Sequence, residues 1–221
     1  MKLTTTTCLL AVAGSLLAQT AIAGELLKAG TGLSGSANAE EAGIAAAKAA
    51  NAQLGDTEPK TVIVFAGRKQ LTPELVKGVG SVFKAELIYG CEGYSPLTSQ
   101  GNLTGHNADG VAVMALAGDV SVSVVSEAAK GKTPKDFADC GEAIGKKLKA
   151  LIDPKLPGKV ILTFGNQHVG DNAHYVKGMT SVLGNEIMLV GAAAGGGEAR
   201  EIVAGRIVQG ENICVLIQGN F

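Results

Sequence analysis

The strongest constraint on the fold is that the second half of the chain repeats the first. Four apolar or glycine-marked segments recur in the same order: residues 61–67 as 159–165, 76–83 as 176–183, 87–90 as 188–191, and 113–118 as 215–219. The offset drifts from 98 residues at the first pair to 101 at the last glycine, as small loop insertions produce. Such a repeat indicates two copies of one folding unit. We predict an internal duplication with halves of about 24–118 and 119–221.

Each predicted half opens with a strand and a helix. In the first half the strand is 26–33 and the helix is 38–54, where Asn38 followed by Glu41 has the spacing of a capping box. Alanine dominates this helix, so the helix can lie close against a sheet. The corresponding strand and helix of the second half are 120–125 and about 135–152.

A buried strand, a helix and another strand follow in each half. The predicted helices are 73–83 and 172–183, and the strands after them end at Gly90 and Gly191. This order is typical of a right-handed parallel crossover unit.

The closing segments, 106–117 and 202–218, are rich in strand-forming residues, and Gln209-Gly210-Glu211 has the composition of a hairpin turn. The sequence therefore predicts an α/β fold of two duplicated halves. Each half consists of strand–helix–strand–helix–strand plus closing strands, and an approximate two-fold axis relates the two.

Residues 1–23 have the character of an export signal. Lys2 provides a positive charge, residues 8–18 are apolar and uncharged, and Ala21-Ile22-Ala23 is a small-x-small cleavage pattern. The apolar run is shorter than the roughly 20 residues that cross a bilayer. We predict a signal peptide cleaved after Ala23 and a single domain, 24–221, in the periplasm or outside the cell. The mature protein is not expected to span the membrane.

Charge, histidine spacing and cysteine count exclude several classes of partner and site. The net charge is −1 and basic residues do not cluster with aromatics, so nucleic acid is not the expected partner. His168 and His174 lack metal-ligand spacing, and we predict neither a metal nor a cofactor. The cysteines left after cleavage, Cys91, Cys140 and Cys214, are too few for a disulfide framework. Whether any two are bridged stays open, although the apolar strand around Cys214 indicates an inert core thiol.

Ligands of parallel α/β sheets bind beyond the carboxyl ends of the strands, and four predicted loops begin there. Glycines at these ends expose N–H groups that can hold a carboxylate or another anion. Arg68, the only arginine before position 200, is a candidate for pairing with that anion. We expect a small-molecule pocket between the two halves, lined by Arg68, Cys91, Glu92, Asn166, His168, Gly195, Gly196 and Glu198.

Cys91 is the candidate for covalent chemistry. A thiol nucleophile needs a nearby base or cation, whereas the adjacent Glu92 raises the pKa of the thiol. We therefore predict a binding domain with no catalytic residue rather than an enzyme. Two alternatives stay open, a thiol-dependent enzyme that uses Cys91 and a non-catalytic assembly or structural protein.

Several glycine-marked motifs resemble the N-terminal domain of FIST sensory proteins. They are Gly32-Leu33-Ser34 before the alanine-rich helix, Val-Phe-Ala-Gly at 64–67, Leu-Ile-Tyr-Gly-Cys-Glu-Gly at 87–93, and Leu-Val-Gly-Ala-Ala-Ala-Gly at 189–195. The resemblance implies a signal-input domain that binds small ligands, such as amino acids or related metabolites. It transfers no catalytic residue.

Two features depart from the family pattern. Family members usually continue into a second domain and work inside the cell, whereas this chain ends at Phe221 and carries an export signal. We therefore expect an exported binder that passes its bound state to a membrane-bound signalling partner.

Overall fold

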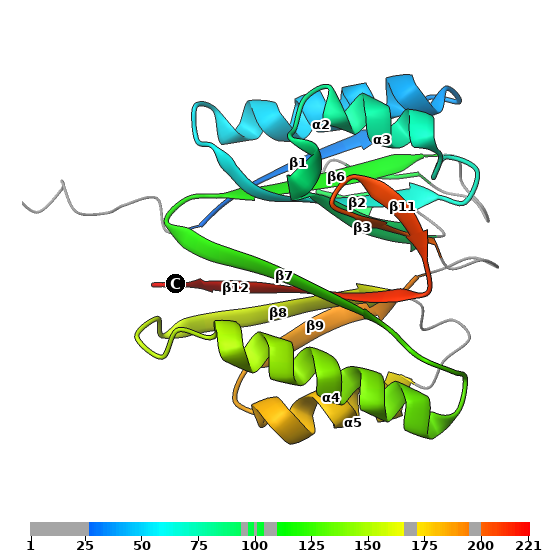
Figure 1. The fold of residues 1–221 in the computed structure, drawn as a ribbon. Helices are drawn as coiled ribbons and strands as arrows, with labels where there is room; N and C mark the ends of the chain where they lie inside the picture. The colour runs from blue at the N-terminus through cyan, green and yellow to red at the C-terminus, as the bar shows by residue number, and fades with distance from the viewer. Residues whose placement is uncertain (1–26, 94–96, 100, 104–109, 166–171, 195–199) are drawn as a thin grey trace, which may run out of the picture.

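The computed structural model describes residues 27–93, 97–99, 101–103, 110–165, 172–194 and 200–221. Two β-sheets face each other at the centre, and a pair of helices covers the outer face of each sheet (Figure 1). The α/β class predicted from the sequence is confirmed.

The first half contains β1 (Lys28–Ser34), α2 (Ala39–Leu54), β2 (Pro59–Gly67), α3 (Pro73–Gly80), a 3₁₀ turn (Ala85–Leu87), β3 (Ile88–Gly93), β4 (Leu97–Thr98), β5 (Gly101–Asn102) and β6 (Val111–Ala117). The second half contains β7 (Val120–Ala128), α4 (Pro134–Leu151), β8 (Gly158–Gly165), α5 (Asn172–Leu183), β9 (Met188–Ala193), β10 (Arg200–Val203), β11 (Arg206–Gln209) and β12 (Glu211–Gly219).

The first four strands of the two sheets have the same topology. The first sheet has the order β1-β6-β2-β3-β10-β11 and the second has the order β7-β12-β8-β9. In both sheets the third and fourth strands are parallel, and the strand from the end of the half lies antiparallel between the first and third. This equivalence is what a duplication predicts, and the duplication itself stays an interpretation of the sequence.

Side-chain caps define the helix starts. The Asn38 side chain accepts the Glu41 N–H at 3.1 Å, so the expected start of α2 is confirmed. Thr72 before Pro73 and Thr133 before Pro134 cap α3 and α4 in the same way. Proline suits the first helical position because an N–H group there would have no acceptor within the helix, so its absence costs nothing.

The alanine-rich helix α2 lies very close to β1. A Cβ atom added to Gly32 would stand 1.9 Å from the carbonyl oxygen of Ala46, and one added to Gly30 would stand 2.0 Å from that of Ala50. Small residues on both sides thus bring the helix backbone onto the strand, as the alanine content predicted.

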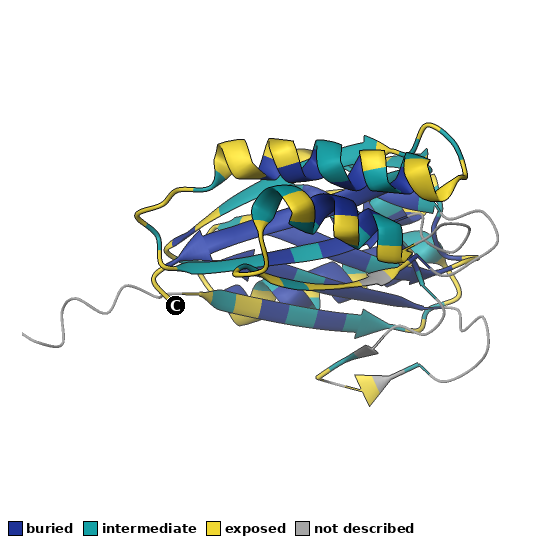
Figure 2. Ribbon diagram, turned by 90° about the horizontal axis from the view of Figure 1, so that it is seen from below, coloured by how far each residue is buried: buried dark blue, intermediate teal, exposed yellow. Residues whose placement is uncertain are grey.

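Three apolar layers hold the elements together. One lies between α2, α3 and the first sheet, another between α4, α5 and the second sheet, and the third between the two sheets. Burial follows this arrangement, because the strands are largely buried and the helices expose residues on their outward faces (Figure 2). In the layer between the sheets, the rings of Phe65 and Phe164 meet edge to face with centroids 5.8 Å apart.

The prediction of a hairpin turn at Gln209-Gly210-Glu211 is wrong. The hairpin joins β10 to β11 instead, at Ala204 and Gly205, which have φ angles of 48° and 71°. Gly210 marks the point where the chain passes from β11 in the first sheet to β12 in the second. The two strands flanking Gly210 therefore belong to different sheets, and local turn composition does not distinguish the two cases.

Helix α3 offers a matched test of the packing between α2 and α3. A Cβ atom at Gly78 would lie 2.3 Å from the carbonyl oxygen of Glu40, whereas Gly80 has nothing within 4 Å. We expect Gly78→Ala to cost about 1–3 kcal/mol by overpacking, and Gly80→Ala to be neutral or to stabilise by up to about 1 kcal/mol. Thermal unfolding of the two variants checks this, and equal melting temperatures would contradict the close helix contact.

Candidate ligand-binding site

The carboxyl ends of the parallel strands lie at one end of the molecule. In the first sheet Gly67 at the end of β2 pairs with Gly93 at the end of β3, and in the second sheet Gly165 pairs with Ala193. The contact between Phe65 and Phe164, just before the ends of β2 and β8, brings the two sets of strand ends together. This end is where open α/β sheets bind ligands.

The consecutive residues Cys91 and Glu92 point to opposite faces of the first sheet. Cys91 is 2% exposed and packs in the layer between the sheets. The Glu92 carboxylate instead bonds to Arg200, whose guanidinium also reaches the loop between β2 and α3 on the helix side. Because side chains alternate along a strand, a single pocket cannot take both.

Glu92 lies at the centre of an ion-pair cluster. Its carboxylate is fully buried, with Oε2 3.1 Å from Arg200 Nε and Oε1 4.0 Å from Arg68 Nε. Arg200 is held by two further bonds, which its terminal nitrogens donate to the carbonyl oxygens of Leu71 at 3.0 Å and Arg68 at 2.5 Å. These bonds fasten β10 to the ends of β2 and β3. We call Arg68, Glu92 and Arg200 the Glu92 cluster.

The Glu92 cluster holds two positive charges and one negative charge. The Arg200 guanidinium bonds to the buried carboxylate and to backbone carbonyl oxygens, whereas the Arg68 side chain is 51% exposed. Among the described residues, Glu92 Oε1 has no hydrogen-bond partner. The cluster therefore places the exposed Arg68 guanidinium next to a buried carboxylate oxygen at the strand ends, and its three side chains carry a net charge of +1.

A second carboxyl group, Glu201, is buried on the opposite face of β10. It lies across from Cys91 in the strand pairing, and its Oε2 accepts the Glu211 N–H at 3.2 Å. Burial is the main cause that raises the pKa of Glu201 to about 8. Hydrogen bonds from the backbone N–H groups of Glu211 and Gly210 lower this pKa, whereas the negative charges of Glu211 and Glu92 raise it. Glu201 thus links the first sheet to the start of β12 in the second, and its neutral form is favoured near neutral pH.

The structure brings Arg68, Cys91 and Glu92, three of the eight predicted lining residues, to this end of the first sheet. The other five, Asn166, His168, Gly195, Gly196 and Glu198, lie outside the described residues. Arg200 and Glu201 were missed by the sequence analysis, because the pairing of β10 with β3 joins positions more than one hundred residues apart. The only local signal was that both follow the glycine-rich segment 195–197.

The three described cysteines are free and buried. Burial raises the pKa of the Cys91 thiol to about 12, and the carboxylates of Glu201 and Glu92 contribute further. Cys214 contacts the hydroxyls of Thr163 and Tyr175 inside the second half. The direction predicted for the effect of Glu92 on Cys91 is confirmed, although burial is the larger cause.

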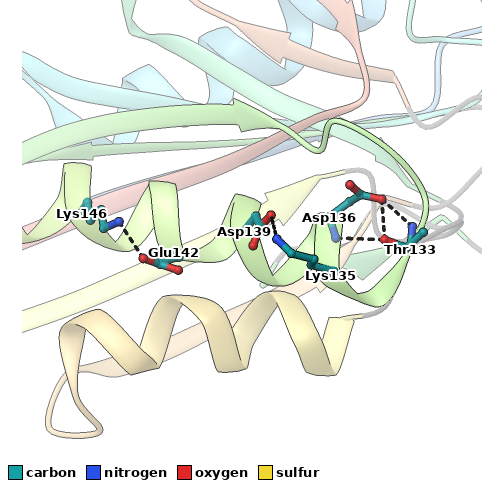
Figure 3. A network of polar contacts seen from close by, with 6 residues as sticks. All are labelled: Thr133, Lys135, Asp136, Asp139, Glu142 and Lys146. Carbon is teal, nitrogen blue, oxygen red and sulfur yellow. Dashed lines mark hydrogen bonds and ion pairs between the residues drawn. The ribbon is translucent and has the colours of Figure 1, made fainter.

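A polar network on the outer side of α4 is explained by the helix itself (Figure 3). Asp136 accepts the Thr133 hydroxyl and N–H, which lowers its pKa and closes a capping box. The i,i+4 pair Lys135–Asp139 spans 2.5 Å and Glu142–Lys146 spans 2.6 Å. Exposed pairs of this kind contribute little to stability, because solvent screens them.

Two pockets in the second half are lined by residues outside the Glu92 cluster. One, of about 120 Å³, is lined by Glu127, Ala128, Lys130, Asp136, Asp139, Cys140 and Ala143. The other, of about 540 Å³, lies where α4 and α5 end, and its lining includes Lys149 and Lys159. Lys149 donates to the carbonyl oxygen of Val182 at the end of α5. Cations at helix C-termini complement the helix dipole, so this lysine has a structural role.

The family follows from a sequence match to residues 60–221, which runs from β2 through β12 and thus includes the Glu92 cluster. These residues match the profile of the FIST N domain, and the chain belongs to the FIST N domain family. FIST domains are sensory signal-input domains, so the resemblance seen in the sequence is confirmed.

Other comparisons are more distant. No curated protein sequence matches the chain significantly. One similar solved structure is that of a cyanuric acid hydrolase from A. caulinodans, at 12% identity and a TM-score of 0.44, covering 90% of this chain and 71% of that one. Among the described residues, no helix is both long and apolar enough to span a membrane.

Glu201 predicts a specific dependence of stability on pH. An unfolded glutamate releases its proton near pH 4.5, whereas the folded Glu201 holds it to about pH 8. Between these values the folded state binds more protons, so this group's contribution to stability falls as pH rises, by at most about 1.4 kcal/mol per pH unit.

Glu201→Gln should therefore melt at a higher temperature than the wild type at pH 8, and the difference should shrink toward pH 4.5. Thermal unfolding across this range measures the effect. Glu58→Gln, which changes an exposed carboxylate paired with Lys84, serves as the control and should follow the wild-type slope between pH 5 and pH 8. A wild-type slope in Glu201→Gln would show that Glu201 is not the responsible group.

Proposed function

We propose that this domain binds a small carboxylate-bearing metabolite at the carboxyl ends of β2 and β3, and that binding is the input signal. The observation that carries the proposal is the exposed guanidinium of Arg68 beside the buried Glu92. Membership of a family of sensory domains supports a ligand-binding role.

The charge of the Glu92 cluster favours an anion. Glu92 is already paired with Arg200 at 3.1 Å, so Arg68 at 4.0 Å contributes the uncompensated charge. A guanidinium can hold a carboxylate through two parallel N–H bonds, which gives geometric selectivity as well as affinity. A carboxylate docked on Arg68 would neutralise the cluster.

The second feature of the cluster favours an amino group on the same ligand. Glu92 Oε1 has no hydrogen-bond partner among the described residues and is the oxygen nearer Arg68. If Arg68 turns toward a bound carboxylate, this oxygen can accept from an ammonium close to that carboxylate. An α-amino acid carries both groups at the required spacing, and it is our proposed ligand class.

Catalysis by Cys91 has little support. The thiol is buried, its pKa is raised to about 12, and its neighbours Glu92 and Glu201 are acidic rather than basic. A nucleophilic cysteine needs the opposite environment.

We further propose that the domain works after export. Lys2, the apolar run 8–18 and the Ala21-Ile22-Ala23 pattern support removal of residues 1–23. The bound state would then pass to a membrane-bound partner. Mass spectrometry of the protein from the periplasmic fraction or medium should give a chain that begins at Gly24, and an uncleaved cytoplasmic protein would contradict the export proposal.

The ligand proposal is tested by thermal shift and calorimetry with the common amino acids and related carboxylates. A ligand at one hundred times its Kd stabilises by about 2.7 kcal/mol, which raises the melting temperature of a domain of this size by about 5–10 °C. Arg68→Gln should weaken binding about 10- to 100-fold, because a charge-assisted hydrogen-bond pair is lost. Arg68→Lys should recover only part of the affinity.

Arg206→Gln is the matched control, since Arg206 is an exposed arginine on β11 outside the Glu92 cluster. It should bind like the wild type. Binding that survives Arg68→Gln unchanged, or a library that produces no thermal shift in the wild type, would argue against the proposed site.

A further inference from the structure

The outer edge of β9 differs from that of its counterpart, β3. Each is the fourth strand of its sheet and is parallel to the strand before it. The free side of β3 is covered by β10, which pairs antiparallel to it through Cys91–Glu201 and Gly90–Ile202. In the part of the chain that the structure describes, no strand covers the same side of β9.

The exposed edge of β9 also lacks the usual protection against pairing. Natural edge strands are protected by charged side chains, proline, bulges or short length. The sequence of β9, Met-Leu-Val-Gly-Ala-Ala, has no charge and no proline, and all six residues pair with β8 in continuous register. Such an edge offers a row of free N–H and C=O groups to another strand.

Two large side chains along this edge are apolar and accessible. Leu189 points toward the helices and packs against their core. Met188 and Val190, on the opposite face, are 63% and 49% exposed and are among the few large apolar side chains at the surface of the described structure. A strand added beside β9 would bring apolar side chains next to both.

We propose that β9 pairs with β9 of a second copy of this chain, which joins the two four-stranded sheets of a dimer into one continuous sheet. A two-fold axis perpendicular to the sheet makes the pair antiparallel, the sense in which β10 pairs with β3. An uncharged strand can oppose itself without like-charge repulsion.

The charge next to the strand fits the same arrangement. Glu186 lies two residues before β9 and is exposed. In an antiparallel pair the Glu186 side chains of the two copies lie at opposite ends of the seam, whereas a parallel pair would place them side by side. With the axis perpendicular to the sheet, Met188 and Val190 of both copies lie on one face and can cover each other.

Sedimentation velocity of the full mature chain over a range of micromolar concentrations tests this inference. We expect a reversible dimer, and Val190→Lys should weaken it about tenfold or more, because the lysines of the two copies meet at the seam. Met188→Lys should act in the same direction. Leu151→Lys is the matched control, since Leu151 is a 43% exposed apolar residue at the end of α4, and it should leave the dimer unchanged.

Hydrogen exchange provides an independent readout that does not rely on a variant. Amide exchange in β9 should slow as the concentration rises, while exchange in β1, an edge strand of the first sheet, stays constant. A protein that is monomeric at every concentration overturns the inference, and so does a dimer that Val190→Lys leaves intact. The outcome is independent of the ligand proposed for the Glu92 cluster, which lies on the first sheet.

Discussion

The packing of the two sheets against each other is the interaction on which the rest of the structure depends. Each half covers one face of its sheet with its own helices, and the other face packs against the other half. The layer between the sheets is built from aliphatic side chains and the ring pair of Phe65 and Phe164. Burial of this second face stabilises the fold, because exposing an apolar sheet face to water is unfavourable.

This packing also builds the candidate site. The chain leaves the second half after β9, adds the hairpin β10–β11 to the edge of the first sheet, and returns to the second sheet as β12. Through this excursion Arg200 reaches Glu92, and Glu201 reaches the start of β12. The Glu92 cluster therefore lies on the first half but depends on a residue from the second. A ligand that shifts the β10–β11 hairpin would therefore change contacts in both sheets.

Much of this fold was predictable from the sequence, and two of the failures have a common cause. The helix cap at Asn38 and the close packing of the alanine-rich helix on β1 were both predicted, because each depends on residues that are close together in the sequence. The crossing at Gly210 and the pairing of Arg200 with Glu92 depend on contacts between distant segments, which local composition does not encode. The alternation of Cys91 and Glu92 could have been inferred, since neighbours on a strand face opposite sides. It separates two residues that the sequence analysis had assigned to one pocket.

A double-mutant cycle on Phe65 and Phe164 tests the face-to-face packing most directly. The variants Phe65→Leu, Phe164→Leu and their combination keep the layer apolar while removing the edge-to-face contact at 5.8 Å. Unfolding free energies should reveal a coupling of about 0.5–1.5 kcal/mol between the two positions. If the loss of unfolding free energy in the double variant equals the sum of the two single losses to within about 0.3 kcal/mol, the rings do not meet. That result would contradict the arrangement of the sheets described above.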